Sequence, residues 1–403
     1  MQAPIEGWCD PGFERVRDAF AANFAERGEV GAGVHVIVDG QVAVDLVGGW
    51  MDQARLTPWR SDTLVDMYSV GKAFLALLIL RLVDEQHLHL DQTIGDLWPE
   101  FATGGKESAT ITHALSHRAG VPAVREVLTD EDLFDWDTMV SAIARTEAWF
   151  RPGDRLVYHT NTYGHLLGEI VRRATGCMPG AQLRELVEPL DADVWFGVPQ
   201  QHQHRCAEVI WAPATPVPTF TSFDGLTGDL LMNVLAHFNP PGYSSVGVVN
   251  TPAWRAAQIG STSGHASASG IARIYSGLIE PEGLLSSDLL ADATRHRFTG
   301  HCPILDDEIT YGLGFQPTTD RRPFGPNRRS FGHFGTGGSL GFADPDSGVA
   351  FGYAMNHVVP RWQSSRNRAL IDAVYECIDR TKQTRSHGAS AHDSGSDPQD
   401  QSG

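Results

Sequence analysis

Ser69 and Lys72 are the pair of residues in this 403-residue chain whose types and spacing most suggest chemistry. Residues three apart on a helix lie on one face, so an amine at 72 would be close enough to take a proton from a hydroxyl at 69. The apolar run 73–80 predicts that the pair opens a buried helix over 72–86. Burial and the helix dipole would both lower the pKa of Lys72 and make it a base. The structural alternative is a capping serine beside a solvated lysine.

Lysine is scarce in this chain, which makes Lys72 stand out. The 31 basic residues comprise 28 arginines and three lysines, at positions 72, 106 and 382. Lys106 lies in a glycine-rich loop and Lys382 near the C-terminus, places where we expect a lysine to be exposed. Only Lys72 begins an apolar helix. Arginine could not replace it as a base, because a guanidinium does not release its proton near neutral pH.

Composition excludes several classes of partner. The 49 acidic residues outnumber the basic ones and give a net charge of −18, which argues against nucleic acid and anionic membranes as partners. The N-terminus has no basic and apolar signal segment, and no apolar run is long enough to cross a bilayer. We therefore expect a cytoplasmic protein without a membrane partner.

No metal or organic cofactor is expected. The five cysteines are scattered and form no C-x-x-C pair, so neither a disulfide framework nor a zinc site is indicated. Three pairs of histidines lack the nearby carboxylate or cysteine that a metal site needs. These pairs are His87 with His89, His113 with His117, and His202 with His204.

Two further segments carry reactive residue types in the same order as a known superfamily. One contains Tyr158-His-Thr-Asn161, and the other is His333-Phe-Gly335-Thr336-Gly337-Gly-Ser339. Together with Ser69-x-x-Lys72 and the stretch 110–122, they make the chain resemble the serine β-lactamases and penicillin-binding proteins. More narrowly, it looks like the family VIII carboxylesterases, which share the class C β-lactamase fold. The resemblance covers about residues 10–380.

The resemblance implies roles for individual residues. Ser69 would be the acylated nucleophile, Lys72 its base or proton relay, and Tyr158 a second proton shuttle. The backbone N–H groups of Ser69 and Thr336 would form the oxyanion hole, because acyl transfer develops charge on one carbonyl oxygen. The glycines at 335 and 337 would let substrate and backbone approach closely.

The chain also departs from the β-lactamase pattern at positions expected to touch substrate. β-Lactamases of this type have a Tyr-x-Asn motif, but in this chain the position of the asparagine is occupied by Thr160. The contact with the amide of the substrate is therefore weakened or moves to Asn161. His333 takes the place of a permanently charged lysine, which weakens recognition of a β-lactam carboxylate at neutral pH. His265, in a Ser-Gly-His segment similar to one in the esterase branch, is a further candidate for lining the pocket. These departures favour esters over penicillins.

A second serine motif competes with the first. The segment 337–341 reads Gly-Gly-Ser-Leu-Gly and matches G-x-S-x-G, the nucleophile elbow of α/β-hydrolases. That fold requires a helix after the serine, whereas Leu-Gly-Phe-Ala-Asp-Pro reads as strand and turn. We therefore favour Ser69 over Ser339 as the nucleophile.

The elements that must position these residues suggest an α+β fold of the β-lactamase/transpeptidase type. Asp39-Gly40 between two β-rich runs, 34–38 and 41–47, predicts a hairpin. Helices are expected over 11–28, 72–86, 136–150, 162–175 and 363–380, and strands near 311–316, 341–344 and 349–355. An antiparallel sheet built from both chain ends would then be flanked by helices. The predicted units are a sheet domain (1–65 plus 295–383), an inserted mainly helical domain (66–294) and a disordered tail (384–403).

The leading functional hypothesis is a serine hydrolase that cleaves small-molecule carboxylic esters through an acyl-enzyme. An acyltransferase of small-molecule biosynthesis on the same fold is the main alternative, because the sequence does not identify the acceptor. A β-lactamase or D-amino-acid peptidase fits less well with His333, and a non-catalytic binding protein fits less well with an intact Ser69, Lys72 and Tyr158. The sequence leaves the oligomeric state open.

Overall fold

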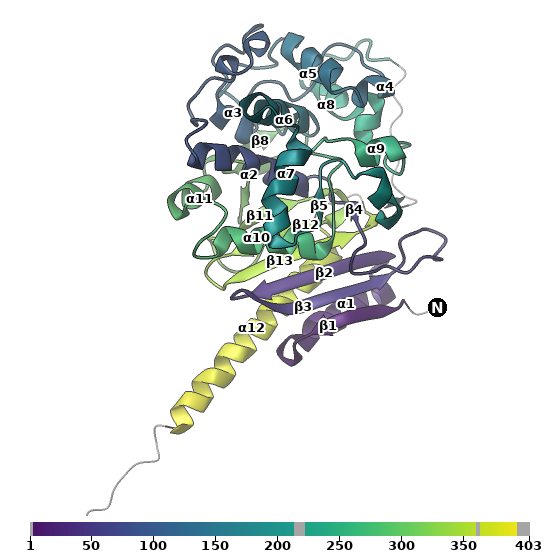
Figure 1. Ribbon diagram of the computed structural model, residues 1–403, viewed down its shortest axis with the longest axis vertical. Coiled ribbons are helices and arrows are strands. Elements are labelled where there is room, and N and C mark those ends of the chain that lie inside the picture. Colours follow the sequence, from purple (N-terminus) through teal and green to yellow (C-terminus); the bar gives the residue numbers. More distant parts are fainter. Residues whose placement is uncertain (1–2, 213–221, 360–362, 393–403) are drawn as a thin grey trace, which may run out of the picture.

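A central antiparallel sheet joins the two ends of the chain (Figure 1). The computed structural model describes residues 3–212, 222–359 and 363–392, with side chains in the last helix up to residue 381. Within these residues the sheet has seven strands in the order β1-β3-β2-β13-β12-β11-β10. Their bounds are β1 (Ile5–Cys9), β2 (Gly31–Val38), β3 (Gln41–Gly49), β10 (Gln316–Pro317), β11 (Phe331–Phe334), β12 (Leu340–Asp344) and β13 (Val349–Met355).

The predicted hairpin and the predicted strands near 341–344 and 349–355 are present, whereas residues 312–315, within the strand predicted near 311–316, form an irregular loop that leads into β10. Strands β2 and β3 pair around Asp39 and Gly40, both of which have positive φ, as a tight two-residue turn requires. Strand β13 pairs with β2 along its whole length, from Val349 opposite Val38 to Met355 opposite Ala32. The N-terminal and C-terminal segments therefore meet at the centre of the sheet.

The alternation of large and small residues along β13 explains which helices cover which face. Val349, Phe351, Tyr353 and Met355 belong to the core beneath α1 (Glu14–Glu26) and α12 (Ser365–His392). The opposite face carries small residues, and at Gly352 an added Cβ would lie 2.2 Å from the backbone oxygen of Ala268. Helix α10 (Ala268–Ile279) packs at this position, because only glycine leaves room for its backbone.

The middle of the chain is mainly helical and lies on the α10 side of the sheet (Figure 1). Its other helices are α2 (Val70–Asp84), α3 (Ile111–Leu115), α4 (Asp130–Leu133), α5 (Trp136–Arg145), α6 (Thr162–Thr175), α7 (Pro179–Val187), α8 (Gly228–Phe238), α9 (Pro252–Ala256) and α11 (Ser287–Thr294). Short 3₁₀ turns are η1 (Pro11–Phe13), η2 (Ile94–Asp96), η3 (Pro99–Phe101), η4 (Glu188–Leu190), η5 (Gln200–Arg205), η6 (Pro241–Ser244) and η7 (Thr336–Gly338). Among the described residues, no helix has the length and apolar character that crossing a bilayer requires.

Short strands complete the structure around this helical part. They are β4 (Val65–Asp66), β5 (Val194–Trp195), β6 (Ile210–Trp211), β7 (His265–Ala266), β8 (Phe298–Cys302), β9 (Asp307–Tyr311) and β14 (His357–Val358). Strand β7 lies between β4 and β5, β8 pairs with β9, and β6 pairs with β14. The pairing of β4 with β7 is important for the site, because β4 leads directly into Ser69.

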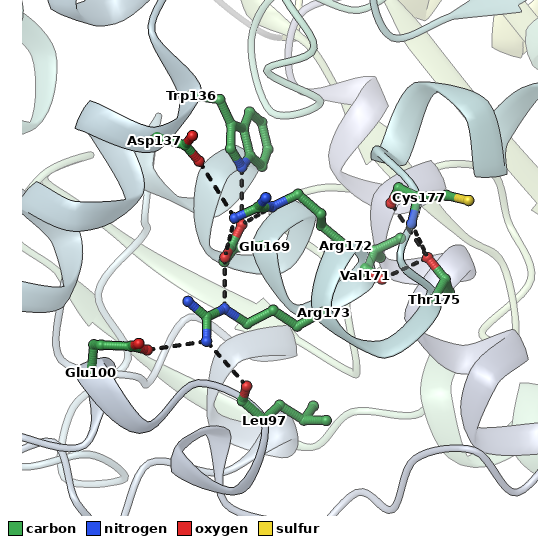
Figure 2. A network of polar contacts seen from close by, with 10 residues as sticks. All are labelled: Leu97, Glu100, Trp136, Asp137, Glu169, Val171, Arg172, Arg173, Thr175 and Cys177. Carbon is green, nitrogen blue, oxygen red and sulfur yellow. Dashed lines mark hydrogen bonds and ion pairs between the residues drawn. The ribbon is translucent and has the colours of Figure 1, made fainter.

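A buried carboxylate ties the helices of this region together (Figure 2). Glu169 of α6 accepts hydrogen bonds from Trp136 of α5 and forms ion pairs with Arg172 and Arg173 of its own helix. Arg173 also donates to the backbone oxygen of Leu97. Trp136, which is partly buried against the core, therefore fixes the packing of α5 on α6, the helix that follows Tyr158 in the chain.

The last helix is longer than the sequence analysis predicted. Helix α12 runs from Ser365 to His392 rather than ending near residue 380, so 384–392, expected to be disordered, continue the helix. This stretch contains no proline, and a glycine at 388 alone does not end a helix. Residues 393–403 of the predicted tail lie outside the described residues. The division into a sheet domain and an inserted helical domain stays a prediction.

Candidate active site

The turn that presents Ser69 is held by a buried aspartate. Tyr68, just before the serine, adopts a left-handed conformation with φ of 49°, which a bulky side chain rarely adopts. Asp66 at the end of β4 accepts a hydrogen bond from the Tyr68 N–H at 2.8 Å and another from the Trp254 indole at 2.7 Å. Burial raises the pKa of Asp66 to about 8, despite these two hydrogen bonds. Ser69 then stands at the N-terminus of α2 without capping it.

Lys72 lies one turn into α2 with its amine beside the serine. The Nζ atom is 3.0 Å from Ser69 Oγ, 2.7 Å from the Thr160 carbonyl oxygen and 2.9 Å from the Ser261 carbonyl oxygen. The side chain is 0% exposed, and burial alone lowers its pKa well below the usual value. The two carbonyls accept two N–H donors of the amine, so the third substituent position on Nζ faces Ser69 Oγ, where a neutral amine would present its lone pair.

Tyr158 lies close to both Lys72 and Ser69. Its ring is 4.8 Å from Lys72 Nζ and 4.7 Å from the ring of His117. Burial raises its pKa, an effect that hydrogen bonding to Ser69 opposes. Burial therefore holds Tyr158 as a neutral phenol beside the Ser69 hydroxyl.

The segment that carries Thr336 is anchored next to the Ser69 turn. Ser339 Oγ donates to the Met67 carbonyl oxygen at 3.0 Å, and the Gly335 N–H donates to the Ser339 carbonyl at 2.8 Å. Among the described residues, the N–H groups of Ser69 and Thr336 donate to no other protein group. Both are thus available to a ligand oxygen.

A buried ion pair supports this segment from behind. Arg366 of α12 contacts Glu29 at 2.6 Å, and its guanidinium also donates to the carbonyl oxygens of Gly337 at 3.3 Å and His357 at 2.8 Å. Glu29 accepts a second hydrogen bond from Tyr353. The pair connects the N-terminal part of the chain to the turn that follows Thr336.

Removing one partner of this pair is expected to destabilise the fold. Arg366→Met leaves the Glu29 carboxylate buried without its counter-ion, which costs about 3–5 kcal/mol in free energy of unfolding. Arg15→Met, which breaks the exposed pair with Glu376, is the matched control and should cost less than about 1 kcal/mol. Urea denaturation of both variants measures the difference. Equal losses would contradict the structural role of Arg366.

A cavity of about 320 Å³ opens in front of these groups. Its polar end is formed by Ser69, Tyr158 and Thr336. Its walls are largely apolar and aromatic, and include Trp211, Phe238, Tyr243, Val246, Leu305 and Phe334. The mixture of apolar walls and a few convergent polar groups is typical of a small-molecule site.

The residues expected to contact substrate divide into two groups. Asn161 and Gly335 line the cavity, although the Asn161 amide is engaged with the Ala236 carbonyl oxygen at 2.8 Å. His333 and His265 are buried and do not line it, because each ring donates to a nearby backbone oxygen and packs behind the wall. Gly337 is also set back, with φ of 81° and its carbonyl bonded to Arg366.

The sequence analysis missed most of the cavity wall. Trp211, His237 and Tyr243 belong to the proline- and glycine-interrupted region 200–260, where no periodicity shows which side chains face inward. Gln316 and Arg322 also line the cavity, but neither lies in a sequence motif that indicates a functional site. The indoles of Trp136, Trp149 and Trp254 do not line the cavity and instead donate to Glu169, the Ala123 carbonyl oxygen and Asp66.

The competing motifs have structural roles. Ser339 is completely buried, bonds to Met67, and is followed by strand β12 rather than a helix, so it does not form a nucleophile elbow. Among the described residues, no three His, Cys, Asp or Glu side chains gather into a group that could hold a metal.

Solved structures share this fold over nearly the whole chain. A family VIII carboxylesterase superposes with a TM-score of 0.84 at 34% identity, over 93% of this chain and 100% of that one. A penicillin-binding protein homologue from Caulobacter crescentus gives a TM-score of 0.83 at 37% identity, with the same coverage.

Related sequences agree with the structures. Esterase/beta-lactamase LipL of Mycobacterium tuberculosis is 32% identical over 402 residues, 95% of this chain and 90% of LipL. Esterase EstB of Burkholderia gladioli is 32% identical over 194 residues, 44% of this chain and 49% of EstB. A family model described as Beta-lactamase matches residues 16–376. With that match over most of its length, the chain belongs to the beta-lactamase family.

Proposed function

We propose that the protein is a serine hydrolase that cleaves carboxylic esters of small molecules through an acyl-enzyme on Ser69. The observation that carries the proposal is the position of the buried Lys72 amine. Its Nζ atom donates to two carbonyl oxygens, and its third contact is with Ser69 Oγ at 3.0 Å. The esterases among the relatives and solved structures of similar fold support the choice of substrate class.

Acylation begins when Lys72 takes the Ser69 proton. Oγ then forms a bond to the ester carbonyl carbon, and the carbonyl oxygen becomes an oxyanion that accepts hydrogen bonds from the N–H groups of Ser69 and Thr336. When the intermediate collapses, the carbon–oxygen bond to the alcohol breaks. Tyr158 donates its phenolic proton to the departing alkoxide. The acyl-enzyme is left with Lys72 as an ammonium and Tyr158 as a phenolate.

Deacylation reverses these transfers with water. Tyr158 takes a proton from the water, and the hydroxide forms a bond to the acyl carbon. As the bond from that carbon to Oγ breaks, Lys72 returns its proton to Ser69. Both shuttling residues end in their starting protonation states, so the cycle consumes only ester and water.

Two features favour esters over β-lactams. The Asn161 amide is held by Ala236, and burial, with a smaller contribution from Lys72, lowers the pKa of His333 to about 3, so neither supplies the polar contacts that a β-lactam amide and carboxylate need. The cytoplasmic location expected from the sequence stays a prediction.

A fluorophosphonate probe tests the proposal most directly. We expect one covalent adduct, located by mass spectrometry on the peptide that contains Ser69, together with hydrolysis of p-nitrophenyl esters. Partitioning of the acyl group between water and added alcohols then separates hydrolysis from acyl transfer. Absence of any adduct would favour a binding protein that lacks turnover.

Substituting Gly335 should damage the oxyanion hole. In Gly335→Ala, the new Cβ would lie 2.1 Å from Ser339 Oγ and 2.6 Å from the Met67 backbone oxygen, so the segment carrying Thr336 must move. We expect kcat for p-nitrophenyl butyrate to fall about 10²–10³-fold, the usual effect of losing one oxyanion donor. Gly300→Ala, whose Cβ would meet only Leu156 at 3.7 Å, is the control and should retain activity.

A further inference from the structure

A second buried tyrosine, Tyr311, lies directly behind Tyr158. It ends strand β9, is 0% exposed, and has its ring centroid 6.1 Å from that of Tyr158. Its hydroxyl oxygen is 2.6 Å from the amide nitrogen of Gln316 and 3.3 Å from His333 Nε2. The ester-cleaving steps described above use none of these three residues.

The hydrogen-bond directions around Tyr311 are fixed by its neighbours. The Gln316 Oε1 atom accepts from the Phe334 N–H, so the Gln316 amine faces Tyr311 and donates to it. His333 donates from Nδ1 to the Phe334 carbonyl oxygen at 2.7 Å. Because burial keeps this imidazole neutral, its Nε2 has no proton and is an acceptor. The single proton of Tyr311 is therefore available to His333.

Tyr158 is the second acceptor for the same proton. Burial raises the pKa of Tyr158. Three interactions lower that pKa in part: a hydrogen bond with Ser69, the charge of Arg322 and a hydrogen bond from Tyr311. A hydroxyl has one proton and donates one hydrogen bond at a time. His333 Nε2 and Tyr158 Oη thus compete for Tyr311.

We propose that Tyr311 is a positioning residue that donates to His333 while Tyr158 is a phenol and turns to Tyr158 when Tyr158 becomes a phenolate in the acyl-enzyme. The proton stays on Tyr311 throughout, so no covalent bond changes. A charged oxygen is the stronger acceptor, which drives the turn. The inference rests on the proposed role of Tyr158 as a proton shuttle. It gives His333 a role in the resting enzyme that does not involve substrate.

Burst kinetics with p-nitrophenyl acetate separate this role from a merely structural one. The p-nitrophenolate leaving group departs without needing a proton, so acylation is insensitive to Tyr158. Tyr158 then releases its proton to solvent beside the ammonium of Lys72, and water attack requires the resulting phenolate. In Tyr311→Phe we expect the burst rate to stay within about twofold and the deacylation rate to fall roughly ten- to a hundredfold, the effect of one hydrogen bond to a charged group. The acyl-enzyme should accumulate.

Tyr163→Phe is the matched control. Tyr163 is also 0% exposed and packs on His117, but its hydroxyl donates to the Leu115 carbonyl oxygen at 3.1 Å. We expect lower thermal stability with both rates unchanged. His333→Leu removes the competing acceptor and should leave deacylation at least as fast as in the wild type, which tests the inference independently of how well Tyr311→Phe folds.

Several results would overturn the inference. For Tyr311→Phe, these are an unchanged deacylation rate, or equal losses in the burst rate and the deacylation rate. A loss of deacylation in Tyr163→Phe as large as in Tyr311→Phe would also overturn it. So would slower deacylation in His333→Leu with an intact burst. Tyr158→Phe distinguishes this from failure of the proposed function. If that variant deacylates normally, Tyr158 is not the shuttle; if it deacylates slowly while Tyr311→Phe does not, only the role of Tyr311 is lost.

Discussion

Ser69→Ala is expected to abolish ester hydrolysis, with kcat for p-nitrophenyl esters lower by about 10⁴-fold or more. The variant lacks the oxygen proposed to form the acyl-enzyme, and the groups close to that oxygen, the amine of Lys72 and the phenol of Tyr158, would have nothing to activate. The fold should be unaffected, because the Ser69 side chain does not cap α2. Steady-state kinetics and thermal unfolding of the same preparation measure both effects.

Ser339→Ala is the control for this result, since Ser339 lies in the other serine motif. Its hydroxyl bonds to the Met67 carbonyl oxygen and has no access to the cavity. We expect a loss of about 1 kcal/mol in stability, the value of one hydrogen bond, and kcat within tenfold of the wild type. Retained activity in Ser69→Ala, or its disappearance in Ser339→Ala with intact folding, would reverse the assignment.

Lys72→Met has the second large effect, a loss of about 10³-fold or more in kcat through the missing base. Lys72→Arg should be as inactive, because a guanidinium stays protonated and offers no lone pair. A lysine that served only to hold the Thr160 and Ser261 carbonyls would be partly replaced by arginine. Substantial activity in Lys72→Arg would therefore contradict the role of Lys72 as a base.

The same substitution has a predictable effect on the pH dependence of stability. Burial lowers the pKa of Lys72 in the folded protein below its value of 10.5 in the unfolded chain. Between these two values the unfolded chain binds one more proton, so Lys72 makes stability rise with pH. The stability of Lys72→Met relative to the wild type should be greatest at low pH and decline towards pH 10.5. Urea unfolding at several pH values measures this difference, and a constant difference would exclude a lowered pKa.

The parts of the fold with local signals could be predicted from the sequence. The hairpin around Asp39-Gly40, strand β13 and helix α6 with its glycine cap at 176 all follow from short-range patterns of residue type. The order of elements also indicated a sheet built from both chain ends, but not that β2 and β13 are the strands that meet. No local pattern specifies which strands become neighbours over so long a separation.

For the site, the sequence was informative about backbone motifs and much less about side-chain direction. Ser69, Lys72, Tyr158 and Thr336 are found around one cavity, as their motifs suggested. The sequence analysis expected His333 to face substrate, yet the strand that carries it turns the ring into the core. A strand's alternation indicates that successive residues face opposite sides, but not which side borders the cavity.

The ion pair between Glu29 and Arg366 has a consequence for the order in which the protein becomes active during synthesis. The two residues are 337 positions apart, so Glu29 leaves the ribosome long before its counter-ion exists. The seven strands of the sheet all precede α12, but burial of that carboxylate and alignment of Thr336 beside Ser69 must wait for this late segment. We therefore expect a nascent chain that already contains the serine, lysine and tyrosine to be inert, and premature termination before α12 to give a protein without hydrolase activity.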